Sequence, residues 1–347
     1  MKLGFKGTDV RERLVLLTGL VPELAMLPFI SMVVNNAVFT AQRLGLFELL
    51  ETEPMTPSAI AARVDIDEHA AQVLLEALAG FGYLERTRGT FAISAELRKS
   101  LSGRMGEMAR SMLEFAPDVA RKFESLDEAV RTGDVSDFHF DPATPGQWQH
   151  YLSFLKLSAA RPTKAITDKV RFDAPPKRML DIAGGPAQYS IAFCEKYPDL
   201  EAVILDLPES AAAGNEEAAK VGMSERISYV VGNFFETQWG TDYDIALLSN
   251  MLHCLKADEC RLILRRAFEA LRPGAVIVTN EPGFPGDDAP IDTFAAYTSL
   301  LYFTVTGGRT HPTPAIEGWL RDAGFQDISM STGGGQTQAI GQKPASS

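Results

Sequence analysis

The sequence predicts an α/β protein in which a Rossmann-like, doubly wound and mostly parallel sheet follows a smaller, mainly α-helical domain. Two observations point to this fold class. After Pro175-Pro176, short apolar runs of strand length alternate with helical segments, which is typical of a parallel sheet covered on both faces. Before that point helical periodicity dominates, except for one short alternating stretch. The length of 347 residues suits about two domains.

Composition narrows the function classes. The 33 Lys and Arg against 45 Asp and Glu give a net charge of −12, which disfavours non-specific binding to nucleic acid or to an anionic membrane. Three cysteines without a CxxC pair argue against a disulfide scaffold and a structural zinc site. We also expect Pro22 and Pro28 to interrupt the apolar stretch 14–29, so that it forms neither a signal peptide nor a membrane span. A cytoplasmic protein without a metal is expected.

The first domain is predicted to be a winged helix. Apolar residues recur at helical spacing over 37–50, a second helix begins at Thr56-Pro57, and a third spans 67–81 and ends at Gly82. Alternation over 83–94 around Arg88-Gly89 predicts a two-stranded wing.

A winged helix raises the hypothesis of a DNA-binding regulator. Its third helix would read the duplex, yet it carries Asp67, Glu68 and Glu76 and no Lys or Arg. Because phosphate neutralisation needs cations on that face, DNA binding is disfavoured. The apolar helices over 20–39 instead favour pairing with a second copy of the chain.

A helical connector is expected between the two domains, which gives the division 1–103, 104–170 and 171–347. Large apolar and aromatic side chains recur along the connector and suit helix packing; some of them are also candidates for lining a substrate pocket. The candidates are Met108, Met112, Trp148, Tyr151 and Phe154.

The second domain is predicted from five strands and the helices between them. The strands are placed at 178–182, 202–205, 227–231, 243–248 and 275–279, and the helices at 188–196, 210–221 and 258–271. In such a sheet, ligands bind at the carboxyl ends of the strands.

The turn after the first of these strands points to a nucleotide-containing cofactor. Asp206 follows Gly185 by 21 residues and suits the two hydroxyls of a ribose. The turn itself, Ala183-Gly-Gly-Pro-Ala187, lacks the G-x-G-x-x-G pattern, and Pro186 removes an amide donor for pyrophosphate. Asp181 would repel pyrophosphate but attract an ammonium group. An adenosine joined to an amino acid, as in S-adenosylmethionine, therefore fits better than a dinucleotide.

A set of motifs, in order, resembles the S-adenosylmethionine-dependent O-methyltransferases with a winged-helix dimerisation domain, the family of caffeate and hydroxyindole O-methyltransferases. The resemblance runs from Asn35 to the C-terminus. The motifs are Leu180-Asp-Ile-Ala-Gly-Gly, Leu205-Asp-Leu-Pro-Glu209, Gly232-Asn-Phe-Phe235, Met251-Leu-His253, Asn280-Glu281-Pro282, Gly307-Gly-Arg-Thr310 and Trp319-Leu…Ala323-Gly-Phe325.

The resemblance implies a role for individual residues. His253 falls at the general base and Glu281 at the acid that orients it. The residues that it places around the cofactor are Gly184, Gly185, Asp206 with its neighbour Leu207, Asn233, Phe234 and Ser158. Asn233 stands where the family usually has an aspartate against the adenine amino group. A homodimer through the N-terminal domain is also implied.

Two departures keep the methyl acceptor open. Cys254-Leu255 follows the histidine where Asp-Trp is common, and His311 replaces a second acid beside the base. Tyr297, Arg309 and His311 are then candidates for contacting the substrate. The leading hypothesis is methylation of an aromatic hydroxyl, because histidine suits removal of a phenolic proton near neutral pH.

The alternatives keep the fold and change the acceptor. A small methylthio acid such as 4-methylthio-2-hydroxybutyrate, with its carboxylate on Arg309 or His311, would be methylated at sulfur, and a carbon acceptor is a further option. In both cases no phenolic proton is removed, and His253 becomes a positioning residue. His69, His139 and His150 lie outside the motifs and are expected to be structural or exposed.

Overall fold

The computed structural model describes residues 10–18, 22–102, 105–141, 146–159, 162–172, 174–286 and 288–345. The chain divides into two compact units, residues 1–117 and 118–347.

The first unit contains short helices and one hairpin, as the sequence predicts. Its elements are α1 (Val10–Leu17), α2 (Glu23–Arg43), α3 (Leu46–Thr52), α4 (Pro57–Val64), α5 (Glu68–Gly80), β1 (Leu84–Thr87), β2 (Thr90–Ile93), α6 (Ala95–Ser100) and α7 (Gly106–Phe123), which continues into the second unit. The predicted helix over 37–50 is two helices, because Gly45 takes φ +67° and separates α2 from α3. Thr56 and Asp67 cap α4 and α5 through their side chains.

Helix α2 corrects one expectation. Pro28 lies inside this 21-residue helix and does not end it. By length and composition alone α2 could cross a membrane, and 11% of its most apolar window is buried. One such helix near the N-terminus is weak support for a span, because helices of other kinds meet the same criteria. Residues 19–21 of the predicted 14–29 stretch lie outside the described residues.

The second unit is built around one seven-stranded sheet. Its helices are α8 (Leu126–Thr132), α9 (Gln147–Ala159), α10 (Pro162–Lys169), α11 (Gln188–Lys196), α12 (Pro208–Lys220), the short η2 turn (Leu252–Cys254), α13 (Ala257–Ala270), α14 (Thr293–Thr306) and α15 (Thr313–Ala323). Its strands are β3 (Arg178–Ile182), β4 (Glu201–Asp206), β5 (Ile227–Val231), β6 (Tyr243–Ser249), β7 (Leu271–Pro282), β8 (Gln326–Gly333) and β9 (Gln336–Gln342). The strand order is β5-β4-β3-β6-β7-β9-β8.

The sheet is mostly parallel, as predicted. The strands from β5 to β7 are parallel to their neighbours, whereas β9 pairs antiparallel with both β7 and β8. The two C-terminal strands extend the sheet beyond the five strands that the sequence predicts.

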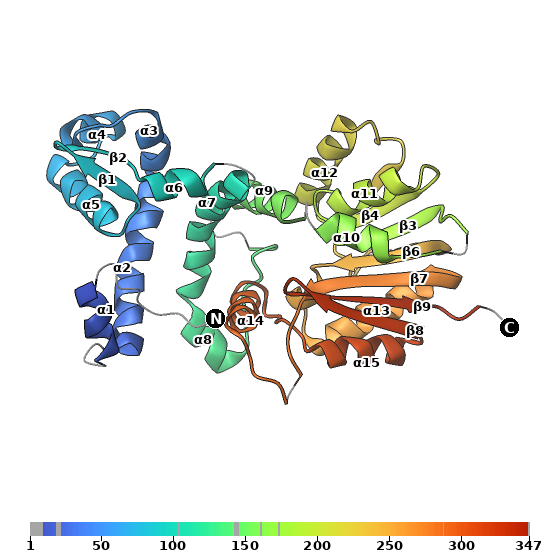
Figure 1. The fold of residues 1–347 in the computed structure, drawn as a ribbon. Coiled ribbons are helices and arrows are strands. Elements are labelled where there is room, and N and C mark those ends of the chain that lie inside the picture. The colour runs from blue at the N-terminus through green and yellow to red at the C-terminus, as the bar shows by residue number, and fades with distance from the viewer. Residues whose placement is uncertain are drawn as a thin grey trace. The chain divides into compact units, whose positions relative to one another are not determined.

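Helices cover both faces of this sheet (Figure 1). Successive residues of a strand point to opposite faces, and Met179 and Leu180 accordingly belong to different apolar clusters. The Met179 cluster includes residues of α10 and α11, and the Leu180 cluster includes residues of α13 and α15. The strands are therefore fixed from both sides, which gives rigid support to the loops at their carboxyl ends.

Candidate functional site

The turn after β3 presents backbone toward a cavity. A Cβ atom at Gly184 would lie 2.6 Å from the Asp181 carboxyl group, so only glycine fits there. Gly185 has φ +56°, and Ala183 and Ala187 also take positive φ, a strained conformation that is common at functional sites.

Asp181 corrects a second expectation. Its side chain is 1% exposed and lies below the turn, where Ser190 Oγ donates a 2.7 Å hydrogen bond to it. Burial raises the pKa of this carboxyl group from 3.8 to about 7. Asp181 therefore supports the turn from beneath and does not line the cavity, because its alternation in β3 directs it into the protein.

Asp206 ends β4 beside the same turn. Its carboxylate accepts hydrogen bonds from the backbone N–H groups of Gly185 at 2.7 Å and Leu207 at 2.6 Å. Burial raises the pKa of Asp206, and the hydrogen bonds from Leu207 and Gly185 oppose that rise. The Ser210 side chain also donates a hydrogen bond to Asp206. Because a carboxylate offers about four lone-pair sites, Asp206 keeps the capacity to accept a further bond from a ligand hydroxyl.

A cavity of about 370 Å³ opens at the carboxyl ends of the strands. It brings together most of the residues predicted to hold the cofactor and two of those predicted to contact the substrate. These are Gly184, Gly185, Asp206, Leu207, Asn233, Phe234 and Ser158, with Trp148 and Tyr151. Asn233 Oδ1 accepts a 2.9 Å bond from the N–H of Phe235, which fixes the loop after β5. In that orientation its amide NH2 group remains available to a ligand.

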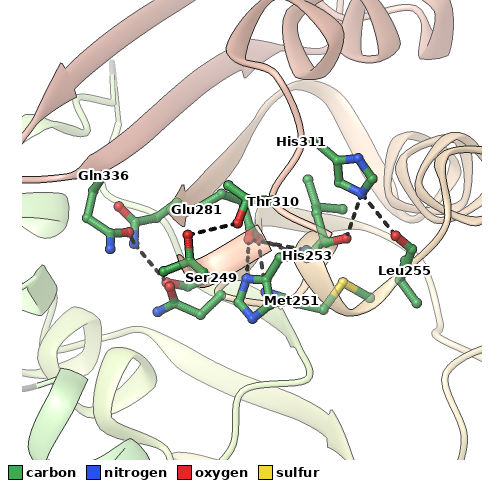
Figure 2. A network of polar contacts seen from close by, with 12 residues as sticks. Ser249, Met251, His253, Leu255, Glu281, Thr310, His311 and Gln336 are labelled. Atoms are coloured by element: carbon green, nitrogen blue, oxygen red, sulfur yellow. Dashed lines mark hydrogen bonds and ion pairs between the residues drawn. The ribbon is translucent and has the colours of Figure 1, made fainter. Parts of the chain in front are cut away.

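The predicted base and its partner form a buried pair (Figure 2). His253 Nδ1 lies 2.7 Å from Glu281 Oε2, and the two residues are 6% and 2% exposed. Glu281 also accepts the backbone N–H groups of Met251 and Leu252, each at 2.9 Å. The end of β7 thus holds the η2 turn and fixes the imidazole.

Sequence neighbours of His253 line the cavity, whereas His253 itself does not. Met251, Cys254 and Leu255 line the cavity, whereas His253 and Glu281 are not among the lining residues. The Tyr302 ring stacks on the imidazole with centroids 3.7 Å apart and an angle of 21° between the planes. Tyr302 therefore covers one face of the histidine.

Several of the predicted substrate residues are not among those that line this cavity. Met108 and Met112 belong to the first unit, on α7, and their contact with substrate stays a prediction. Phe154 and Tyr297 are in the second unit but are not among the lining residues, and Tyr297 is 56% exposed.

Arg309 and His311 line a separate, more open apolar hollow. The Arg309 guanidinium lies over the Phe284 ring. His311 Nε2 contacts the carbonyl oxygens of Leu255 at 2.9 Å and Leu252 at 3.2 Å, and Figure 2 shows its ring beside Leu255. Burial lowers the pKa of His311. Carbonyl oxygens only accept hydrogen bonds, so the Nε2–H group of His311 donates to them. His311 therefore supports the η2 turn, and its contact with substrate stays a prediction.

The sequence analysis does not predict Asp137 and His139 as site residues, yet both line the cavity, beside Tyr151. They sit in a loop without periodicity, and their spacing matches no motif, so no sequence signal marked them. Among the described residues, no group of three or more His, Cys, Asp and Glu could hold a metal ion.

Comparison with known proteins places both parts of the chain. The family model for the O-methyltransferase domain matches residues 151–326, and that for the O-methyltransferase dimerisation domain matches residues 29–96. The 3-hydroxy-5-methyl-1-naphthoate 3-O-methyltransferase of Streptomyces sahachiroi is 28% identical over 82% of this chain and 84% of its own. Acetylserotonin O-methyltransferase of Bos taurus is 27% identical over 88% of this chain and 93% of its own.

Solved structures share the fold. The crystal structure of human N-acetylserotonin methyltransferase in complex with S-adenosylmethionine superposes with a TM-score of 0.73 at 21% identity, covering 98% of this chain and 100% of that one.

Proposed function

The chain belongs to the O-methyltransferase family, and from this premise we propose that it transfers the methyl group of S-adenosylmethionine to an aromatic hydroxyl of a small molecule. The observation that carries the proposal is the buried His253–Glu281 pair beside the cavity. Relatives named for methylation of hydroxylated aromatic compounds support the choice of acceptor.

The cofactor is S-adenosylmethionine, and the cavity residues fit it. Asp206 would hold the ribose hydroxyls, Gly184 and Gly185 would lie against the methionine part, and Phe234 would contact the adenine. When bound, the cofactor supplies a methyl carbon made electrophilic by its sulfonium. The protein's share is to hold the acceptor oxygen about 3 Å from that carbon and in line with it.

The histidine pair determines where the acceptor proton goes. Because an ionised carboxylate only accepts hydrogen bonds, Nδ1 must carry the proton that lies toward Glu281. The Nε2 lone pair is then available to remove the acceptor's proton as the oxygen attacks. Glu281 stabilises the resulting imidazolium and holds its tautomer, as the acid of a catalytic triad does.

The test is turnover of a panel of phenols, thioethers and carboxylates, with S-adenosylhomocysteine and methylated product measured by mass spectrometry. His253→Ala should lower kcat for a phenol by roughly 10²–10⁴-fold. His150→Ala is the matched control, because His150 also pairs with a carboxylate, Asp118 at 2.9 Å, but does not line the cavity. Equal turnover of phenols by wild type and His253→Ala would refute the base, and absence of phenol methylation by wild type would refute the acceptor class.

We also propose that two copies of the chain form a homodimer through the N-terminal unit, which contains the match to the O-methyltransferase dimerisation domain. Helix α2 supports this, because it exposes apolar side chains that a single copy leaves in water. They are Leu24, Met26, Phe29, Ile30, Met32 and Val33. Light scattering should give twice the monomer mass, and Phe29→Asp with Val33→Asp should give the monomer.

A further inference from the structure

A second carboxylate–histidine pair lies in the wall of the cavity. Asp137 Oδ1 accepts two hydrogen bonds from His139, one from its backbone N–H at 2.9 Å and one from Nδ1 at 2.8 Å. His139 Nε2 lies 3.1 Å from the Tyr151 hydroxyl. All three residues line the cavity, so the chain Asp137–His139–Tyr151 reaches ligand space.

The acid fixes the direction of this chain. Asp137 accepts from His139 Nδ1, which directs Nε2 toward the Tyr151 hydroxyl. When the Nε2 lone pair faces Tyr151, the hydroxyl donates its proton to it. Burial, followed by the nearby Cys254 and Asp206, raises the pKa of Tyr151 well above its ordinary value, so it keeps that proton. A phenol oxygen that donates one bond can also accept bonds, which gives Tyr151 acceptor capacity toward a ligand.

Aromatic packing holds the network in place. The Phe138 ring meets Tyr151 edge to face at 4.8 Å, and Trp148 meets it at 5.7 Å. The backbone N–H of Phe138 donates to the carbonyl of Val305 at 3.0 Å, which ties the loop to the end of α14. The Tyr151 hydroxyl is thus preorganised, and a ligand that bonds to it need not order the group.

The network lies near the predicted reaction centre. Tyr151 shares the cavity with Cys254, which follows His253 in sequence, and with Asp206, the proposed ribose ligand. Both are near enough to influence its titration. Tyr151 therefore shares the cavity with a proposed cofactor ligand and with the turn that carries the base.

We propose that Tyr151, aligned by His139 and Asp137, binds a second hydroxyl group of the aromatic acceptor and so selects dihydroxylated over monohydroxylated substrates. This inference rests on the proposed function, because it takes the reacting hydroxyl to face His253. The second hydroxyl of the acceptor donates a hydrogen bond to Tyr151 Oη, and the Tyr151 hydroxyl donates its own proton to His139 Nε2.

The experiment compares two acceptors that differ by one hydroxyl, such as a methylatable phenol and its dihydroxylated analogue. Wild type should show at least about tenfold higher kcat/KM for the dihydroxylated compound, within the range of one buried hydrogen bond. Tyr151→Phe should remove most of that preference through KM and leave the monohydroxylated compound within about threefold. His139→Phe should act in the same direction, because it removes the group that orients the phenol.

Two controls isolate the network. Asp137→Asn should reduce the preference, whereas Asp118→Asn, the same change in the His150 pair that does not line the cavity, should leave it unchanged. Tyr297→Phe removes an exposed phenol and should also change nothing.

Three results would overturn the proposal. They are an unchanged preference in Tyr151→Phe, an equal loss for both acceptors, or a loss confined to S-adenosylhomocysteine affinity, which would identify a ribose contact. If wild type methylates no phenol, the proposed function fails separately. Calorimetry of the two compounds with the S-adenosylhomocysteine complex still decides the inference, because only the dihydroxylated one should lose affinity in Tyr151→Phe.

Discussion

Replacing Glu281 with glutamine removes the group that organises the histidine turn. The two carboxylate oxygens receive different donors: Oε1 accepts the backbone N–H groups of Met251 and Leu252, and Oε2 accepts His253 Nδ1 at 2.7 Å. A glutamine side chain has only one acceptor oxygen. Its NH2 group must therefore face either the backbone N–H groups of Met251 and Leu252 or Nδ1 of His253. If the NH2 group faces His253, Nδ1 can only accept, the tautomer reverses, and the proton moves to Nε2.

The magnitude follows from that reversal. An imidazole with Nε2 protonated cannot accept the acceptor's proton, and the equivalent tautomer error in a serine protease triad lowers kcat by about 10⁴-fold. We therefore expect Glu281→Gln to lower kcat by roughly 10²–10⁴-fold and by no more than His253→Ala does, which is about 2.7–5.5 kcal/mol of activation free energy. A buried donor left unpaired should also lower the free energy of unfolding by about 1–3 kcal/mol.

The assay is single-turnover formation of S-adenosylhomocysteine, together with urea unfolding. Glu317→Gln on α15 is the control, because that acid is partly exposed, pairs with Arg321 and lies outside the cavity lining. The double variant with His253→Ala should be no slower than His253→Ala alone, because the two residues act as one unit. The reasoning is refuted if Glu281→Gln retains more than a tenth of wild-type kcat, or if its effect adds fully to that of His253→Ala.

Three further predictions concern the support of the site. Gly184→Ala should weaken S-adenosylhomocysteine binding in calorimetry and lower stability by about 1–3 kcal/mol, because the new Cβ would overlap the Asp181 carboxyl group; Gly318→Ala, a helical glycine with open space, should be neutral or stabilising. Burial raises the folded-state pKa of Asp181 from 3.8 to about 7. Its contribution to stability is therefore fully present below about pH 4 and is lost as the pH rises through 7. The loss in the free energy of unfolding is at most about 4 kcal/mol. Urea unfolding of Asp181→Asn should lack that part of the decline, and an identical pH dependence would contradict the buried placement. His311→Phe should lower stability by about 1–3 kcal/mol, because it removes the His311 donor from the Leu255 carbonyl and one of several donors from the Leu252 carbonyl. It should not selectively raise KM for acidic acceptors.

The parts of the fold that the sequence predicts are those with strong local signals. The turn after β3 and the helix α11 that follows it were predicted at their observed residues, because a buried strand, glycines and helical periodicity coincide there. Strands β8 and β9 were missed. Strand β9 pairs with β7, although more than 50 residues separate the paired positions in the sequence. Local sequence patterns carry little information on such long-range pairing.

For the site, residue type and motif order were informative, but side-chain direction was not. His253 and Glu281 meet because β6 and β7 are adjacent and parallel, which topology dictates. Asp181 was assigned to the ligand although its direction in β3 buries it. The sequence predicts that His139 is structural or exposed, because it lies outside the motifs. In the folded loop it instead contacts both Asp137 and Tyr151.

The position of β9 between β7 and β8 has a consequence for synthesis of the protein. β7 carries Glu281 and pairs with residues 336–342, which are made more than 50 residues later. Until they leave the ribosome, one side of β7 is an unpaired edge, and such edges invite aggregation. The nascent chain thus exposes one side of the strand bearing Glu281 until residues 336–342 emerge, and we expect chaperones to bind during that interval of translation.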